Sequence, residues 1–135
     1  MKVLSLTQPW ASLVCLGSKA VETRSWRSWY TGELFIHASK GYPKWAREMA
    51  KEEPFYSELC RPHGVWSQPE SVLGCIIGRV NLIRCVPTSK FLPDTLEKEF
   101  GDYSEGRWAW IMSDPQFLPS PIPAKGSLGI WEFTA

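Results

Sequence analysis

The sequence has little of what zinc sites and disulfide scaffolds are built from. Its 135 residues include four cysteines and two histidines. The cysteines lack the close pairs that zinc sites use, and the histidines stand far apart with no ligand pattern around them. We therefore expect buried free thiols, no metal and no cofactor. The residues concerned are Cys15, Cys60, Cys75, Cys85, His37 and His63.

Long hydrophobic runs are also missing. A membrane-spanning helix needs roughly 20 consecutive apolar residues, and no stretch of this chain approaches that length. The opening residues MKVLSLTQPW do not contain the apolar segment of a secretion signal. We expect a soluble intracellular protein, cytoplasmic or, in a eukaryote, nuclear, with no membrane partner.

A strong charge of one sign is absent too, because the net charge is only +1. The charge is nevertheless uneven: residues 1–51 hold eight Lys or Arg and three Glu, and the rest of the chain holds seven Lys or Arg and eleven acids. A basic first third indicates a polyanion as partner if it forms one face. An ordinary solvated surface accounts for the same pattern, and both interpretations stay open.

The length fits one domain over residues 1–135, since domains commonly run about 100–150 residues.

Thr7 is placed to cap a first helix, which Gly17 would end. Gly74 and Gly78 predict bulges in the longest strand. Residues 115–123 contain too many prolines for a central strand, so we expect a connection there. Strands are expected before Thr7 and over 20–25, 33–39, 71–86, 107–113 and 129–134, and helices over 8–17, 43–51 and 96–100, with a turn or two over 55–60 and an exposed loop over 61–70.

These elements predict an α+β domain, either a small mixed or closed β-barrel with helices at one end or an open sheet. The charged run GSKAVETR, residues 17–24, lies between the first helix and the next strand. Because strand side chains alternate, Glu22 and Arg24 share one face of that strand, and Lys19 stands at the turn into it. We expect these three side chains to meet in one cleft.

The residues of this run carry a family resemblance. LSLTQPWASLVCLGSKAVETRSW, residues 4–26, has the G-x-K-x-x-E-x-R pattern at Gly17, Lys19, Glu22 and Arg24, and it resembles the ASCH domain of the PUA-like superfamily. Residues 73–86 and 108–133 are similar to the ASCH module of a eukaryotic transcription coactivator. The resemblance implies a small PUA-like mixed β-barrel of about five to six strands with two to three short helices, and a ligand cleft at which Glu22 makes contact.

Basic and aromatic residues alternate just after this run, as they do in proteins that bind single-stranded nucleic acids. Lys19, Arg24 and Arg27 are suited to phosphates. Three to five such contacts predict a logarithmic salt slope of roughly −2 to −3.5 for a single strand. The candidate contacts for RNA, single-stranded DNA or a nucleotide-like ligand are Lys19, Glu22, Arg24, Trp26, Arg27, Tyr30, Gln8 and Trp10, with Trp29 as a further stacking ring. For Trp10, Trp108, Trp110 and Trp131 we favour a place in the core.

Two other functions are kept open. Some ASCH relatives are amidohydrolases that act on acetylated cytidine with a lysine, a threonine and a glutamate, and others are suspected nucleases. Lys19 matches that lysine and is the candidate catalytic residue, but Glu22 stands where those enzymes carry threonine. Residues 77–80 read IGRV where they carry the glutamate. The third function is a protein-interaction module in transcription. The sequence leaves the oligomeric state open, with a monomer as the expectation.

Overall fold

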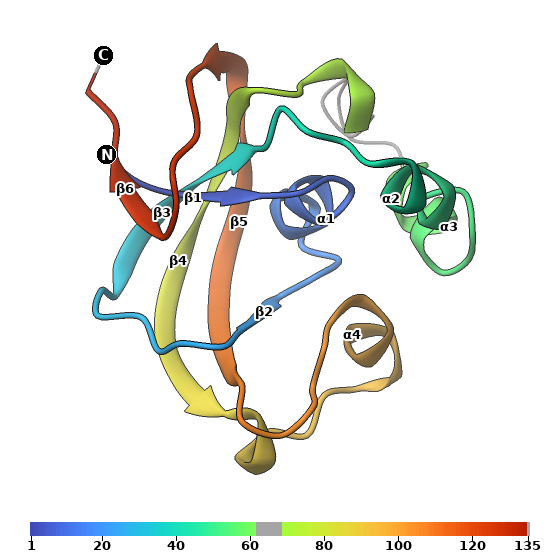
Figure 1. The fold of residues 1–135 in the computed structure, drawn as a ribbon, viewed down its shortest axis with the longest axis vertical. Coiled ribbons are helices and arrows are strands. Elements are labelled where there is room, and N and C mark those ends of the chain that lie inside the picture. The colour runs from blue at the N-terminus through green and yellow to red at the C-terminus, as the bar shows by residue number, and fades with distance from the viewer. Residues whose placement is uncertain (62–68, 135) are drawn as a thin grey trace.

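The computed structural model describes residues 1–61 and 69–134, and its ribbon is shown in Figure 1. Six strands form one sheet, in the order β2-β5-β4-β3-β1-β6. The pair of β1 with β3 is parallel and the other pairs are antiparallel. The elements are β1 (Lys2–Leu6), α1 (Trp10–Leu16), β2 (Val21–Arg24), β3 (Gly32–Ala38), α2 (Lys44–Met49), α3 (Phe55–Leu59), η2 (Pro69–Ser71), β4 (Cys75–Pro87), η3 (Thr88–Lys90), α4 (Thr95–Phe100), β5 (Trp108–Pro123) and β6 (Ile130–Glu132).

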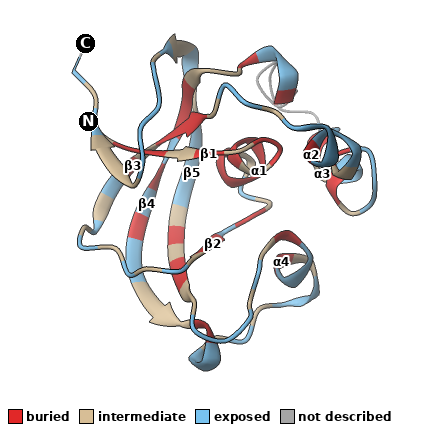
Figure 2. Cartoon of the chain, in the orientation of Figure 1, coloured by how far each residue is buried: buried red, intermediate tan, exposed pale blue. Residues whose placement is uncertain are grey.

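The sheet curls into a half-barrel around α1 (Figure 1). Figure 2 shows that buried residues concentrate on α1 and on the strand segments that face it. Helix α1 is short, but Ala11, Val14 and Cys15 join the core between strands from both ends of the sheet. The predicted α+β class and PUA-like barrel are confirmed, with the barrel open along one side.

The open side lies between the two ends of the sheet. Within the described residues β2 and β6 do not pair with each other. The side chain of Arg24 reaches across from β2, and its Nη2 donates to the carbonyl oxygen of Ser5 on β1 at 3.3 Å. The side chain of Arg24, a candidate ligand-binding residue, therefore spans the gap between the two ends of the sheet.

Two expectations about the helices are wrong. The described residues contain four α-helices rather than two to three. The side chain of Thr7 does not cap α1, whose N-cap position is held by Pro9 without a side-chain hydrogen bond. The carbonyl oxygen of Thr7 accepts from the Trp10 amide, while Gln8 Oε1 accepts from the Ser12 amide at 2.9 Å. At the other end, Gly17 has φ of 84° and ends the helix as predicted.

The expected proline-rich connection is also wrong, because residues 115–123 form the second half of β5. The first half of β5 pairs with β2 on one side and with β4 on the other. The second half pairs with β4 alone, so it is an edge strand, where a proline whose nitrogen faces away from β4 removes no ladder hydrogen bond. The predicted bulge at Gly78 is confirmed by register shifts next to it in both strand pairs.

The cysteines differ from expectation in their burial. All four are free thiols, but only Cys15 is buried, and its pKa is raised by that burial. Cys60 is exposed, while Cys75 and Cys85 are half-buried. The expected loop over 61–70 lies mostly outside the described residues, and its described end forms η2.

Candidate functional site

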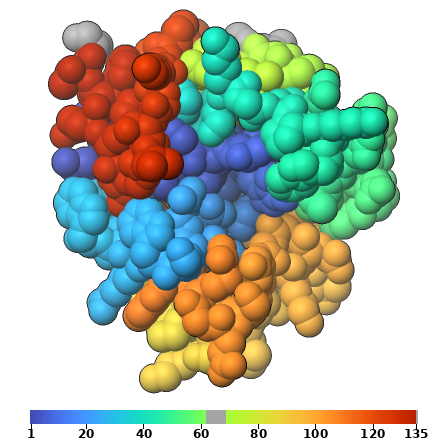
Figure 3. All heavy atoms as spheres, viewed as in Figure 1, coloured from blue at the N-terminus to red at the C-terminus, as the bar shows by residue number. Residues whose placement is uncertain are grey.

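A cleft of about 550 Å³ opens on the face shown in Figure 3, where β1, β2, α2 and the α4–β5 connection meet. In that view the dark blue N-terminal residues lie between the green α2 segment and the orange residues around 100–110. Ligand pockets for small molecules are commonly about 300–1,000 Å³. The cleft is lined by Ser5, Leu6, Thr7, Trp10, Glu22, Thr23, Arg24, Trp45, Met49, Glu99, Phe100, Gly101, Asp102 and Arg107.

Strand β2 places a carboxylate and a guanidinium side by side on the cleft wall. Its burial alternates, so that Val21 and Thr23 are buried while Glu22 and Arg24 are half-buried. Arg24 Nε lies 3.4 Å from Glu22 Oε2. The Arg24 guanidinium also lies over the rings of Trp26 and Trp110, 5.9 Å from each centroid. The sequence-based prediction that Glu22 and Arg24 share a face is confirmed.

Lys19 lies behind this wall and does not line the cleft, since its side chain is only 1% exposed. Its ammonium donates to the carbonyl oxygen of Val21 and lies 3.6 Å from Glu22 Oε1. On the other side Glu97 Oε2 of α4 is 4.0 Å away. Lys19 thus reaches the Glu22–Arg24 pair from the protein interior, where a bound phosphate would not meet it.

Glu97 is a charged group that the sequence did not indicate. Its Oε1 accepts from the Ala20 amide at 2.5 Å, which ties α4 to the start of β2. Burial raises the pKa of Glu97, and the charge of Lys19 opposes that increase. Tyr103 lies in the same region; its pKa is raised by burial and by the nearby carboxylates of Glu97, Asp94 and Glu22. Two buried side chains, Lys19 and Glu97, and two half-buried ones, Glu22 and Tyr103, therefore form an ionisable cluster at and beneath the cleft wall.

Aromatic rings form the opposite part of the lining. Trp10 Nε1 donates to the Phe100 carbonyl oxygen at 2.9 Å, which holds its ring between α1 and α4. Trp45 of α2 packs against Trp10 with ring centroids 5.8 Å apart, yet it stays 59% exposed. The cleft therefore carries one anchored and one accessible indole ring.

The remaining candidates from the sequence lie outside the cleft lining. Gln8 is buried, and its amide nitrogen donates to Ser12 Oγ at 2.8 Å and to the Pro69 carbonyl oxygen at 3.4 Å. Tyr30 is half-buried, and its hydroxyl donates to the Glu33 carbonyl oxygen. Both side chains thus have partners within the fold.

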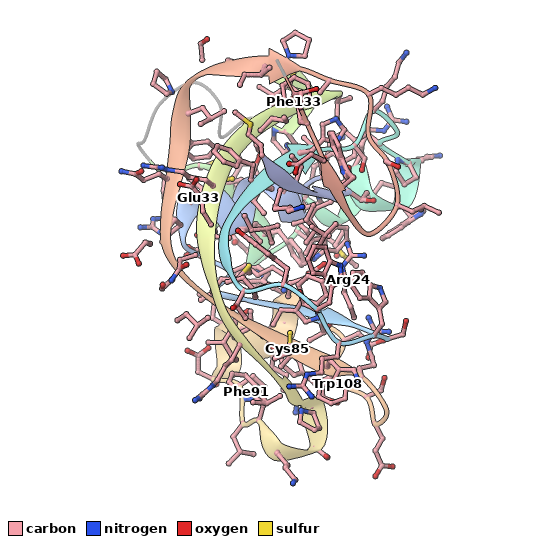
Figure 4. All side chains as sticks on the ribbon, turned by 90° about the vertical axis from the view of Figure 1, so that its left-hand side faces the viewer. Arg24, Glu33, Cys85, Phe91, Trp108 and Phe133 are labelled. Carbon is pink, nitrogen blue, oxygen red and sulfur yellow. The ribbon has the colours of Figure 1, made fainter. Side chains whose placement is uncertain are left out.

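The aromatic segment after β2 separates into core and surface residues. Trp26 packs edge-on against the fully buried Trp110, with centroids 4.8 Å apart. Arg27 is exposed and lies over the ring of Trp108, whose position below Arg24 is labelled in Figure 4. Trp29 is 69% exposed and has the ammonium of Lys2 over its ring. Of the four tryptophans considered as core, only Trp110 is fully buried, while Trp10, Trp108 and Trp131 are half-buried.

The other wall of the cleft was not predictable from the sequence. Glu99, Asp102 and Arg107 come from α4 and the segment after it, which carries no recognisable motif. Asp102 Oδ2 lies 3.6 Å from Arg107 Nε, and the pKa of Asp102 is lowered by hydrogen bonds from Ser104. The sequence feature that could have pointed to these three residues is the high density of charged side chains in residues 97–107. That density does not show where the segment packs.

Two negative findings apply to the described part of the chain. It contains no helix that is long and apolar enough to cross a membrane. No group of three or more His, Cys, Asp or Glu side chains among residues 1–61 and 69–134 is arranged to hold a metal ion.

The half-barrel sheet with a helix in its curl is the fold of a known class of domain. Residues 4–116 match the ASCH domain, and the chain belongs to that family. It is 33% identical over 132 residues to Activating signal cointegrator 1 of Mus musculus, and equally to that of Homo sapiens. Those alignments cover 96% of this chain and 22% of either relative, so the chain spans about a fifth of their length.

Solved structures share the fold. The crystal structure of ASCH from Zymomonas mobilis superposes with a TM-score of 0.51 at 18% identity, covering 90% of this chain and 72% of that one. The similarity to the ASCH family that the sequence suggested is therefore confirmed.

Proposed function

We propose that the cleft binds single-stranded RNA, single-stranded DNA or a nucleotide-like ligand. The observation that carries the proposal is that Glu22 and Arg24 line the same cleft as the rings of Trp10 and Trp45. Aromatic side chains bind unpaired bases by stacking, with each base contributing roughly 1–3 kcal/mol. Polar groups beside a stacked base supply the hydrogen bonds that orient it.

The proposal is tested with fluorescently labelled single strands and duplexes of equal length. We expect single-stranded RNA or DNA to bind more tightly than duplex, because bases inside a duplex cannot stack on Trp45. The substitution Trp45→Ala should weaken single-strand binding by about fivefold or more, which is the lower end of the stacking contribution. Tighter binding of duplex, or no binding of any strand, would contradict the proposal.

Tyr56→Ala is the matched control for this substitution. Tyr56 is an aromatic residue of α3 with 53% of its surface exposed, close to the 59% of Trp45, and it does not line the cleft. It should leave binding unchanged. Equal losses for both variants would place the binding surface outside the cleft.

One observation favours a second function, hydrolysis of a modified nucleoside. The sequence alone offered no carboxylate for this chemistry, but Glu97 lies 4.0 Å from Lys19. Proton exchange between a lysine and a carboxylic acid during amide hydrolysis needs a separation of about 2.6–3.2 Å, so this pair would have to close from 4.0 Å when substrate binds. Incubation with N4-acetylcytidine should then release cytidine and acetate, and Lys19→Ala should abolish nearly all turnover. The absence of cytidine release by the native protein would exclude this activity on that substrate.

A further inference from the structure

We propose that the cleft takes the base of an unpaired nucleotide by its edge and leaves the phosphate outside. This inference rests on the proposed function, because it states which part of the nucleotide enters the same cleft. It departs from the expectation, drawn from the sequence, that cations at this site bind phosphates.

The charges of the lining disfavour a phosphate. Glu22, Glu99 and Asp102 face two guanidinium groups, those of Arg24 and Arg107. Each guanidinium already lies beside a carboxylate, Arg24 at 3.4 Å from Glu22 and Arg107 at 3.6 Å from Asp102. An entering phosphate would compete with Glu22 and Asp102 for the two guanidinium groups. The carboxylates of Glu22, Glu99 and Asp102 would also repel it, because like charges repel within a cleft of this size. A neutral group does not meet that repulsion.

The Glu22–Arg24 pair complements the edge of a base. In the described part of the chain, the Glu22 carboxylate makes two ion pairs at 3.4 Å and 3.6 Å and accepts no hydrogen bond. Its oxygens can therefore still accept from a ligand, while the Arg24 guanidinium beside it can donate. An unpaired base presents donors and acceptors next to each other on its Watson–Crick edge.

The tryptophans provide ring faces on which such a base can stack. Trp10 is fixed by its hydrogen bond to Phe100 and by edge contact with Phe55, with centroids 5.9 Å apart. Trp45 has no such hydrogen bond to the described residues and is 59% exposed, so its side chain is less constrained than that of Trp10. A fixed and a less constrained ring next to a donor–acceptor pair provide both stacking and orientation for one base.

The test is a titration of the ¹⁵N-labelled protein, observed at the indole N–H signals of Trp10 and Trp45. The ligands are the four ribonucleosides, their 5′-monophosphates and inorganic phosphate. Trp10→Phe and Trp45→Phe assign the signals. We expect at least one nucleoside to shift them, with a Kd within about threefold of that of its monophosphate. Inorganic phosphate should leave them unchanged.

Glu22→Gln is the decisive variant. Loss of a charge-assisted hydrogen bond should weaken nucleoside binding by about tenfold or more. Glu33→Gln is the control, because Glu33 pairs with Arg79 at 2.6 Å and lies away from Arg24 in Figure 4. A backbone amide spectrum as dispersed as that of the native protein shows that the fold of either variant is intact.

Three outcomes would overturn the inference. One is a shift caused by inorganic phosphate, and another is a monophosphate that binds far more tightly than its nucleoside. The third is binding of labelled single strands without any shift by nucleosides, which would leave the proposed function standing. If neither strands nor nucleosides bind, the proposed function fails together with the inference.

Discussion

Lys19 Nζ and Glu97 Oε2 face each other at 4.0 Å beneath the cleft, from side chains that are 1% and 10% exposed. The sequence places these residues far apart, and the fold joins them by packing α4 against the turn that precedes β2. Lys19 also faces Glu22, so one buried cation lies between a carboxylate of the cleft wall and a carboxylate of α4. A ligand that contacts Glu22 therefore contacts a residue of the folded core network.

Removal of the Lys19 charge should destabilise the domain. Lys19→Met keeps most of the aliphatic stem but leaves Glu97 buried without a cation, and breaking a buried pair in this way typically costs about 3–5 kcal/mol. We expect that loss in the free energy of unfolding at pH 7, measured by denaturant titration. The loss should shrink as pH falls, because burial already raises the pKa of Glu97 and protonation removes its charge.

The double variant Lys19→Met/Glu97→Gln separates charge from packing. It removes both charges, so it should lose less stability than Lys19→Met alone. If the loss of unfolding free energy in the double variant equals the sum of the losses in Lys19→Met and Glu97→Gln, the Lys19–Glu97 pair contributes nothing and the cost lies in packing.

His37 should make stability depend on pH. Its ring is buried, Nε2 lies 2.7 Å from the Ala124 carbonyl oxygen and Nδ1 lies 2.9 Å from Ser5 Oγ. Burial lowers the pKa of His37 below its ordinary value of 6.5. Between the lowered pKa of the folded state and the ordinary value of 6.5 in the unfolded state, the unfolded chain binds more protons than the folded one. The contribution of the neutral His37 ring to the free energy of unfolding is thus fully present above pH 6.5 and is lost as pH falls through the folded-state pKa.

His37→Gln should remove this pH-dependent part. We expect the difference in unfolding free energy between pH 7.5 and 5 to be smaller in the variant than in the native protein. The comparison of the two proteins cancels other titrating groups, including Glu97. An imidazole NMR titration with a midpoint at or above the ordinary value would contradict the prediction.

Gly17→Ala should destabilise the end of α1. Gly17 has φ of +84°, and an added Cβ would lie 3.1 Å from Pro115 Cγ. An L-residue in this conformation costs roughly 1–2 kcal/mol, and we expect a decrease of that size in the free energy of unfolding. Gly41→Ala is the control, because an added Cβ there meets nothing within 4 Å. Equal effects of the two substitutions would refute the argument.

The helix end at Gly17 and the alternation along β2 were predictable because each follows from local chain geometry. The position of Lys19 was not, because the turn after a helix can place a side chain on either side of the sheet. The strand over residues 115–123 was missed for a related reason. Proline excludes a central strand, but the sequence does not show that the partner strand β2 ends before the prolines begin. Trp45 could be assigned to a helix, while its contact with Trp10 depends on how α2 packs against α1.

The salt dependence of single-strand binding should be shallower than the basic first third of the sequence suggests. Lys19 is buried, and Arg24 and Arg107 are each beside a carboxylate, so these three cations contribute little to phosphate binding. Lys44 and Arg47 line a different cavity, between α2 and α3. Arg27 is exposed and is the nearest cation in sequence to β2 that remains available.

With one or two phosphate contacts, the slope of log K against log salt for a single strand is expected at about −0.7 to −1.4. Arg27→Ala should make the slope shallower by about 0.7, whereas Arg84→Ala, at an exposed position of β4, should leave it unchanged. Binding of a labelled single strand measured across salt concentrations gives both values. A slope of about −2 or steeper would mean that several phosphates meet cations on this protein, as the sequence alone predicted. The nucleotide would then be held mainly through its phosphates rather than through the edge of its base.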